Sequence, residues 1–361
     1  MSGRMEKSAS ITPALTAGAL AGVENLAAEA VAAVTRQIYA RHPELLQRFG
    51  EQGRNACRDD LQRHLEYLLA ALNCASPAPF SDYARWLHAV LESRGVPGGH
   101  VAESLHLLQE FFRERLLPAD LPAVDSVLQA GIAALSGAPG VAEAPAYQRL
   151  LPPSLPQSAD YLQALLAGNR AGATNTVLEV MARQTSLVEI GMGVIQPAMY
   201  EIGALWQNNR ISVAQEHLAT AISQTVMARA FAQADFAAPL NRRALFACAP
   251  GNQHSLGLRM VSDAFEVAGW EVQFLGADVP GKDLLAQVAQ WRPELLGLSL
   301  SLPGQIKPAR ALVEQLRAEL GTQCPAILAG GLATNQAEGL WKALGADLWA
   351  AHAGDSLKEA M

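Results

Sequence analysis

One histidine in this sequence is well placed to do chemistry. His254 lies in the loop Gly251–Gly257, which directly follows the short apolar run Ala244–Ala249. Such a run predicts a buried strand, and open α/β sheets bind ligands in the loops that follow the carboxyl ends of their strands. A neutral imidazole in that position can coordinate a metal ion. The alternative is an ordinary histidine between a strand and a helix, so the other strand ends decide the interpretation.

Two further landmarks stand at later strand ends. Ser299 and Ser301 lie at the end of one apolar run, and Gly330-Gly331 lies at the end of the next. The carboxyl ends of parallel strands meet at one edge of a sheet, so these residues and His254 are expected on the same side of the fold. This shared position favours a ligand-binding role for His254.

A second polar group lies at the end of a predicted helical bundle. An apolar stripe in steps of three or four residues consists of Met192, Ile195, Met199, Ile202 and Trp206. Glu216 and His217 stand in the first turns of the next helix, and the tight connection brings both side chains close to Trp206. Alone, Trp206 would be read as a core residue. An acid and a histidine beside an indole indicate a site.

The elements that must position the first group occupy residues 243–361. Short apolar runs alternate there with helical patterns, the last predicted helix being Asn335–Leu344. The predicted strands are Ala244–Ala249, Glu271–Leu275, Leu295–Leu300, Ala326–Ala329 and a final one near Asp347–Ala351. Five strands with helical crossovers predict a doubly wound parallel sheet.

Two helical modules precede the sheet, which makes the fold class α plus α/β. Residues 158–236 predict four helices that end in a long pair, Thr185–Gln207 and Ser212–Ala234, and Ser212 with Gln215 forms a capping box. Residues 137–157 are rich in proline and predict a linker. Residues 15–136 predict an all-helical domain with the helices Ala17–Ala40, Pro43–Phe49, Asn55–Asn73, Phe80–Arg94, Pro97–Leu116 and Leu121–Leu135.

Composition excludes several classes of function. The chain has 361 residues, 50% of them hydrophobic and 17% charged, with a net charge of -7 and no basic stripe, which disfavours nucleic-acid binding. Four spaced cysteines favour a reducing, cytoplasmic setting over a disulfide scaffold. The apolar stretch Ile11–Val23 is followed by Glu24 and Glu29, which breaks any run long enough to cross a bilayer. No membrane partner is expected.

The first group of residues resembles the cobalamin-binding module, in which Asp-x-His-x-x-Gly, Ser-x-Leu and Gly-Gly follow successive strands. This resemblance implies that His254 is the lower axial ligand of cobalt. It further implies that Gly257, Ser299 and Gly330-Gly331 line the slot for the cofactor's displaced base. Two positions depart from the pattern, because Asn252 replaces the acid and Ser301 replaces the leucine. A neutral Asn252 behind the ring donates less charge than a carboxylate, so a weaker cobalt–histidine bond is expected.

The second group resembles the helical cap of adenosylcobalamin-dependent photoreceptors. The segments that match are Ile202-Gly203-x-x-Trp206 and Val213-Ala214-x-Glu216-His217. The resemblance implies that Trp206 stacks over the upper axial group, that Glu216 hydrogen-bonds its ribose hydroxyls and that His217 completes the polar wall. Gln207 stands where transcription-regulating members carry a second cobalt ligand, so either His217 or water is expected to take the upper position after photolysis.

The whole arrangement resembles the photocobilins, photoreceptors that join a globin-like domain to the cobalamin modules and bind biliverdin. The residues that would suit a tetrapyrrole with propionates are Tyr83, Trp86, His88, Arg94, His100 and His106. The alternative for these residues is a helical spacer with no ligand.

These observations favour a light sensor over an enzyme. Photolysis of the cobalt–carbon bond is expected to change domain packing. No kinase, cyclase or DNA-binding segment is evident up to Met361, so the signal is expected to leave through a light-dependent homo-oligomer or a separate effector protein. Two alternatives stay open: a corrinoid carrier of methyl groups for methyltransferases, and a cobalamin store or structural adaptor.

Overall fold

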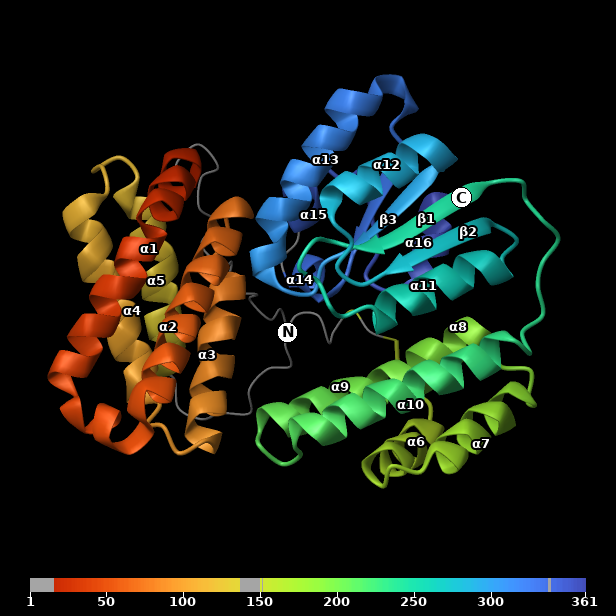
Figure 1. Ribbon diagram of the computed structural model, residues 1–361, viewed down its shortest axis with the longest axis horizontal. Helices are drawn as coiled ribbons and strands as arrows, with labels where there is room; N and C mark the ends of the chain where they lie inside the picture. The colour runs from red at the N-terminus through yellow and green to blue at the C-terminus, as the bar shows by residue number, and fades with distance from the viewer. Residues whose placement is uncertain (1–15, 137–149, 151, 337–338) are drawn as a thin grey trace, which may run out of the picture. The chain divides into compact units, whose positions relative to one another are not determined.

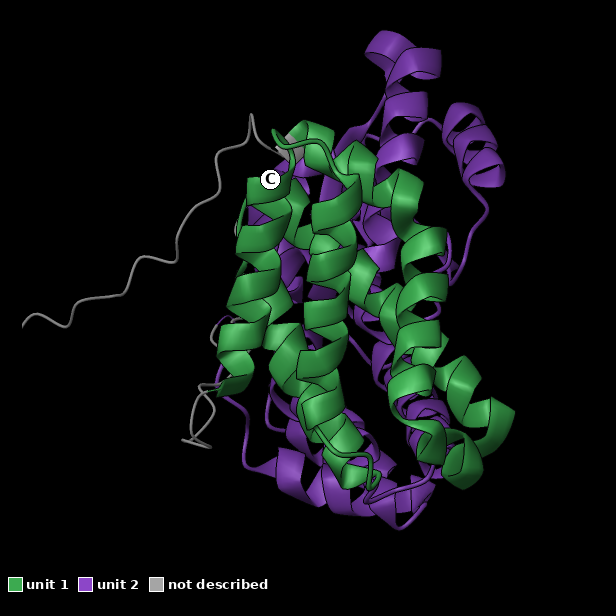
Figure 2. Ribbon diagram, turned by 90° about the vertical axis from the view of Figure 1, so that its left-hand side faces the viewer, with its two compact units in different colours: residues 1–143 green, residues 144–361 purple. Residues whose placement is uncertain are grey.

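The computed structural model describes all residues except 1–15, 137–149, 151 and 337–338 (Figure 1). The chain forms two compact units, Met1–Glu143 and Ala144–Met361 (Figure 2). Most of the proline-rich segment predicted as a linker, 137–157, lies outside the described residues. Each unit is therefore considered by itself.

The first unit is all-helical in its described part, as the sequence predicts. Its helices are α1 Thr16–Arg41, α2 Pro43–Asn73, α3 Ala78–Ser93, α4 Gly99–Arg115 and α5 Leu121–Ser136. The predicted break after Phe49 is present as a kink within α2, where Gly50 adopts φ 62° and ψ −162°. A positive φ is open to glycine at little cost, so the chain turns there and continues as helix. The two predicted helices of this segment are thus one kinked helix.

Helix α1 is apolar enough and long enough to pass a test for a membrane span, over Ala17–Arg41. One face of the helix is buried, which amounts to 22% of this apolar window. Ala19, Val23, Ala30 and Val34 are fully buried and join the core of the first unit, with side chains from α2 to α5. The spacing of these residues by four or seven positions is that of a helix with one buried face.

The second unit begins with a helical cap. Its elements are α6 Gln157–Leu166, α7 Arg170–Met181, α8 Leu187–Ile190, a π-helical turn Gly191–Ile195, α9 Gln196–Gln207 and α10 Val213–Phe231. The predicted helix Thr185–Gln207 is therefore interrupted by a π turn, which its apolar spacing did not indicate. The start of α10 agrees with the prediction, since Ser212 and Gln215 form the capping box.

The rest of the second unit is the predicted five-stranded parallel sheet. Its strands are β1 Arg243–Cys248, β2 Glu271–Gly276, β3 Leu295–Ser299, β4 Ala326–Gly330 and β5 Leu348–Trp349. The order β2-β1-β3-β4-β5, with every pair parallel, places β1 and β3 in the middle. The helices that connect and follow the strands are α11 Leu256–Val267, α12 Gly281–Trp291, α13 Ile306–Leu320, α14 Leu332–Asn335, α15 Leu340–Ala343 and α16 Ala353–Ala360, with 3₁₀ turns at Pro303–Gln305 and Gly321–Gln323. Strand order reverses between β1 and β3, where doubly wound sheets bind ligands.

Two predictions near the carboxyl terminus were wrong in detail. The helix expected over Asn335–Leu344 is replaced by the short helices α14 and α15, which flank residues that the structure does not describe. The strand expected near Asp347–Ala351 is reduced to the two residues of β5. Hydrogen bonding explains the shorter strand in part, because the Asp347 carboxylate accepts the Ile327 N–H at 2.8 Å and takes the place of a backbone partner.

The cap packs on the helical layer of the sheet domain. Met260 of α11 and Ala353 of α16 belong to the buried core of the cap. The Arg259 guanidinium of α11 lies 5.6 Å from the ring centre of Phe231, the last residue of α10. Helix α11 therefore links the cap directly to the loop that contains His254, since the helix begins two residues after it.

Candidate functional site

His254 lies on the loop between β1 and α11, at the carboxyl edge of the sheet. Its side chain is exposed, and its ring has no hydrogen-bond or ion-pair partner among the described residues. The loop itself is held firmly: the His254 N–H donates to Asn252 Oδ1 at 3.0 Å, and the His254 carbonyl lies 3.7 Å from the buried thiol of Cys248. The backbone of this loop is fixed, and a ring nitrogen with no partner among the described residues can coordinate a metal ion.

Asn252 is fully buried beneath this loop. Besides accepting the His254 N–H, its amide Nδ2 donates to the Ser299 carbonyl at 2.8 Å. The sequence placed Asn252 behind the His254 ring. The structure shows both of its polar groups joined to backbone, so its first task is to tie the end of β3 to the loop after β1.

Asp278 holds the same loop from β2, and sequence reasoning missed it. Its carboxylate accepts the Gly251 N–H at 2.7 Å and the Gln253 amide at 3.0 Å. Its own N–H donates to the Asn252 carbonyl at 2.9 Å. Asp278 has a φ of 48°, a left-handed conformation that aspartate tolerates better than most residues. Its position just after a predicted strand was the signal that could have identified it.

Gln305 is the second residue that the sequence did not single out. It is buried, and its Oε1 accepts the N–H groups of Ser301 and Leu302 at 2.8 and 3.1 Å. Its Nε2 donates to the Gly251 carbonyl at 3.2 Å. Gln305 therefore joins the loop after β3 to the His254 loop. Ser301 enters this network through its backbone, so its departure from leucine leaves the network intact.

The three predicted glycines differ in what surrounds them. A Cβ added at Gly257 would meet nothing within 4 Å, and one at Gly330 would stand 3.6 Å from the Ala350 carbonyl. At Gly331, with φ +100°, the added Cβ would lie 2.2 Å from the Leu300 carbonyl oxygen. Gly331 is thus required by the fold, whereas Gly257 leaves open space beside the His254 loop.

Trp206, Glu216 and His217 lie at the end of the cap formed by the turn between α9 and α10 (Figure 1). Trp206 is 37% exposed, so it is not a core residue. The Glu216 carboxylate accepts the Thr220 hydroxyl at 3.0 Å and lies 2.5 Å from His217 Nδ1. The side chain of His217 is 75% exposed. An indole, a carboxylate and an imidazole are thus open to a ligand at one end of the bundle.

Comparison with known families identifies the cofactor class. Residues 242–360 match the B12 binding domain family, and residues 157–230 match a second family of the same description. These are cobalamin-binding domains. They cover the sheet domain and the cap respectively, so both polar groups described above lie in cobalamin-binding parts of the chain.

Several curated proteins resemble the cobalamin-binding part. The HTH-type transcriptional repressor CarH of Myxococcus xanthus is 32% identical over 142 residues, which are 39% of this chain and 46% of that protein. Dimethylamine corrinoid protein 2 of Methanosarcina acetivorans is 29% identical over 111 residues, 30% of this chain and 50% of that protein. The chain thus spans about half the length of these relatives. The solved monomethylamine corrinoid protein of Methanosarcina barkeri is 20% identical, with a TM-score of 0.47 over 55% of this chain and 94% of that one.

The residues present fit a cobalamin. The uncommitted His254 imidazole offers the nitrogen ligand that cobalt requires, and the open space at Gly257 leaves room beside it. In Figure 1 the strands of the sheet point toward the same side of this unit as the turn between α9 and α10. Exposed apolar side chains at that turn, Val213 and Leu218 with Trp206, provide a surface that a cofactor would cover.

The residues predicted to bind a bilin lie in the first unit, outside the cobalamin-binding domains. Tyr83 is buried, and its hydroxyl lies 2.8 Å from Nδ1 of the buried His64. Its ring stacks on Tyr67 at 3.9 Å, and half-buried Trp86 follows at 6.0 Å. Burial lowers the pKa of His64 to about 3, so the imidazole is neutral and forms part of the core. Both the hydroxyl and the ring of Tyr83 are therefore occupied by contacts within the protein.

His88 and Arg94 of the predicted bilin set lie toward the end of α3. His88 Nε2 lies 3.3 Å from the Glu92 carboxylate, and the exposed Arg94 donates to the Val90 carbonyl at 3.2 Å. These two side chains hold the end of α3, although both remain near Trp86 in sequence.

His100 and His106 of α4 have different surroundings. His106 is exposed, and its Nδ1 lies 2.8 Å from the Ala102 carbonyl of its own helix. His100 belongs to a cluster with His42 and Glu103. His106 thus contacts its own helix, and His100 contacts His42 and Glu103.

Proposed function

We propose that this chain is a cytoplasmic light sensor that binds adenosylcobalamin and acts without being an enzyme. The observation that carries the proposal is the exposed Trp206 at the same end of the cap as Glu216 and His217, in the same unit as the imidazole of His254. Similarity to the repressor CarH supports it. A carrier of methyl groups has no need of an indole and a carboxylate at this end of the cap.

Each residue has a defined task in this proposal. Adenosylcobalamin supplies a cobalt–carbon bond that light can break. His254 would hold the cobalt, and Ser299 with Gly330-Gly331 would border the bound cofactor. Trp206 packs against the adenosyl group. Glu216 is fixed by Thr220 at one oxygen and accepts hydrogen bonds from ribose hydroxyls.

The proposed signal is a change in how the cap packs on the sheet domain. Loss of an adenosyl group would leave the exposed Trp206 without a packing partner. The cap packs on α11 through Met260, and α11 starts two residues after His254, so a change at either face of the cofactor acts on the same helix. The altered packing would then be read by a second copy of this chain or by a separate effector protein.

Illumination tests this function directly. The full chain loaded with adenosylcobalamin in the dark is expected to change its absorbance spectrum irreversibly under green light, with release of the adenosyl group. Size-exclusion chromatography before and after illumination measures the change in association. A methylcobalamin-loaded sample serves as the comparison. An unchanged elution volume together with adenosylcobalamin that bleaches no faster than the free cofactor would refute the light-sensing role.

Glu216→Gln is expected to weaken binding of adenosylcobalamin by about tenfold or more, because a hydrogen bond to a charged group contributes about 1.5–3 kcal/mol. Methylcobalamin has no ribose in its upper ligand, so its affinity should change little. Titration of both cofactors measures the ratio. Glu179→Gln, an exposed position on α7, is the matched control. Equal losses for the two cofactors would show that Glu216 acts on the fold instead of on the adenosyl group.

The second candidate is a corrinoid carrier subunit for methyl transfer. Similarity to the dimethylamine corrinoid proteins of Methanosarcina acetivorans favours it. A carrier would bind methylcobalamin at least as well as the adenosyl form and would exchange methyl groups with a methyltransferase. The ratio of the two affinities separates the candidates.

Biliverdin binding by a globin-like first unit remains part of the proposal. Half-buried Trp86 on the Tyr67–Tyr83 stack offers an aromatic flank, and Arg94 lies at the end of the same helix. Co-expression with a haem oxygenase is expected to yield a chain with a red-absorbing band, which Trp86→Ala would weaken. A colourless chain that also shows no spectral shift with added biliverdin would make this unit a spacer.

A further inference from the structure

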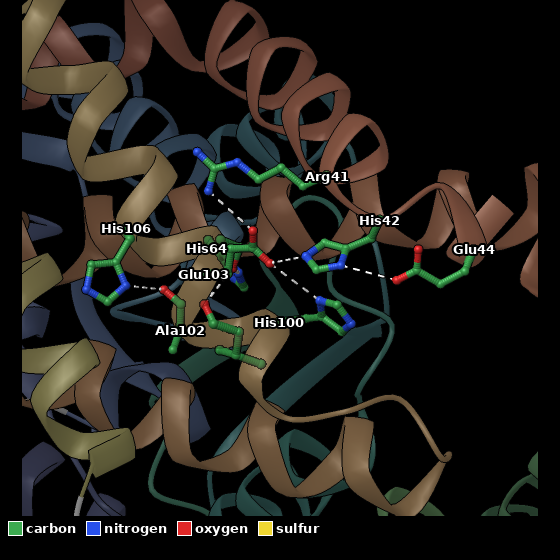
Figure 3. Close-up of polar contacts among 10 residues, drawn as sticks. Arg41, His42, Glu44, His64, His100, Ala102, Glu103 and His106 are labelled. Carbon is green, nitrogen blue, oxygen red and sulfur yellow. Dashed lines mark hydrogen bonds and ion pairs between the residues drawn. The ribbon is translucent and has the colours of Figure 1, made fainter.

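Two histidines and a glutamate meet at the junction between α1 and α2. His42 is the single residue between these helices, and His100 and Glu103 lie one turn apart at the start of α4 (Figure 3). His42 Nε2 lies 2.7 Å from Glu103 Oε2, and His100 Nδ1 lies 3.6 Å from the same oxygen. One nitrogen or oxygen from each of the three residues lies within 4.8 Å of the others.

The surrounding charges orient this cluster. Arg41 binds the other oxygen of Glu103 at 3.3 Å, which leaves Oε2 to face the two imidazoles. Glu44 lies 3.3 Å from His42 Nδ1, on the side of the ring away from Glu103 (Figure 3). A carboxylate that accepts a hydrogen bond from the other nitrogen of a ligating histidine is common at metal sites, because it fixes the ring and raises its basicity.

We propose that His42, His100 and Glu103 bind a divalent transition-metal ion such as Zn²⁺, with a further coordination position left for water or an added ligand. Two imidazoles and one carboxylate form a ligand set that Zn²⁺ uses in proteins. This inference concerns the first unit alone and stands independently of the cobalamin function.

Accepting the ion would draw the three ligand atoms together, since they lie within 4.8 Å of one another. Zinc bonds of about 2.0–2.1 Å place tetrahedral ligand atoms roughly 3.3 Å apart, so the contact of His42 with Glu103 would open slightly and that of His100 would close. The side chains of His42, His100 and Glu103 are 30%, 18% and 21% exposed, so an ion can enter while the ligands stay ordered.

Protons compete with the metal ion for the ring nitrogens of the histidines. The hydrogen bond to Glu103 raises the pKa of His42, with Glu44 adding to the effect. A metal ion displaces the proton from the ring nitrogen, so binding should release protons and weaken as the pH falls. The ion would replace a charged hydrogen bond with a bridge that ties the α1–α2 junction to α4.

Zinc titration of the tag-free, chelator-treated full chain tests the site. One Zn²⁺ per chain should bind. His100→Ala should weaken that binding by about 100-fold or more, since loss of a residue that only supports a ligand already costs about 10–100-fold. Glu44→Gln should weaken it by about 10–100-fold. His106→Ala, an exposed histidine on the same helix, should bind Zn²⁺ like the unaltered chain.

Visible spectra with Co²⁺ in place of Zn²⁺ give a second readout, because tetrahedral Co²⁺ bound to nitrogen and oxygen produces intense d–d bands. Glu103→Gln, which keeps the side-chain volume, should abolish these bands while circular dichroism shows an intact helical fold. Equal zinc affinity in the His100 and His106 variants, or no stoichiometric binding by the unaltered chain, would overturn the proposal.

Discussion

Replacing His254 with alanine is expected to remove the lower cobalt ligand and to lower the affinity for adenosylcobalamin by more than about tenfold. The reason is geometric, because His254 presents an uncommitted ring at the carboxyl edge of the sheet from a loop held by Asn252 and Asp278. The absorbance spectrum should lose its histidine-bound form. Electron paramagnetic resonance of the photoreduced sample should lose the coupling to a ring nitrogen of the protein.

Gln253→Ala is the matched control for this change. Gln253 is the exposed neighbour of His254, and its amide bonds to Asp278. Its loss should leave the spectrum unaltered and cost little affinity. A His254→Ala protein that retains both the wild-type spectrum and the wild-type affinity would refute the ligand assignment.

Gly331→Ala is expected to destabilise the sheet domain by about 3 kcal/mol or more, since left-handed strain costs about 1–3 kcal/mol and overlap in a packed region a similar amount. The overlap is with backbone: the new Cβ would stand 2.2 Å from the Leu300 carbonyl oxygen, which already accepts the Ala333 N–H. For a unit of this size, the midpoint of thermal unfolding should fall by roughly 6–12 °C.

Substitutions at two other glycines distinguish an effect on folding from an effect on cofactor binding. Gly99→Ala lies in the first unit with open space around the new Cβ and should leave the unfolding of the sheet domain unchanged. Gly257→Ala also meets nothing within 4 Å and should fold normally without cofactor, yet it should bind cobalamin more weakly because the methyl group enters the slot. A Gly331→Ala protein as stable as the Gly99→Ala control would contradict the steric argument.

Periodicity was sufficient to predict the sheet, since each strand is a short apolar run set off by turn residues and followed by a helical pattern. It was insufficient near Asn335, because α14 and α15 are single turns whose ends depend on tertiary hydrogen bonds. The Asn335 side chain donates to the Ala351 carbonyl and accepts from Trp349 Nε1, contacts between segments that sequence spacing does not relate.

At the candidate site, too, sequence pattern predicted part of the arrangement and tertiary hydrogen bonds decided the rest. Motif spacing placed His254, Ser299 and Gly331 at one edge of the sheet, where the structure has them. It could not reveal what Asn252 does, because a replaced acid suggests lost charge, whereas the amide nitrogen is needed by the Ser299 carbonyl 2.8 Å away. An aspartate there would turn an oxygen toward that carbonyl. Asp278 and Gln305 were missed for a related reason, since they act on backbone groups that any sequence supplies.

The π turn at Gly191–Ile195 has a consequence for comparing this chain with its relatives. A π turn holds one residue more than an α turn, so every later residue of α9 is rotated by about 100° about the helix axis compared with an uninterrupted α-helix. The direction in which the Trp206 side chain leaves the helix therefore depends on the one extra residue in this turn. A relative that lacks that residue would keep the same sequence at the end of the cap but direct those side chains elsewhere, so a one-residue insertion or deletion here reorients the Trp206 end of the cap without changing its sequence.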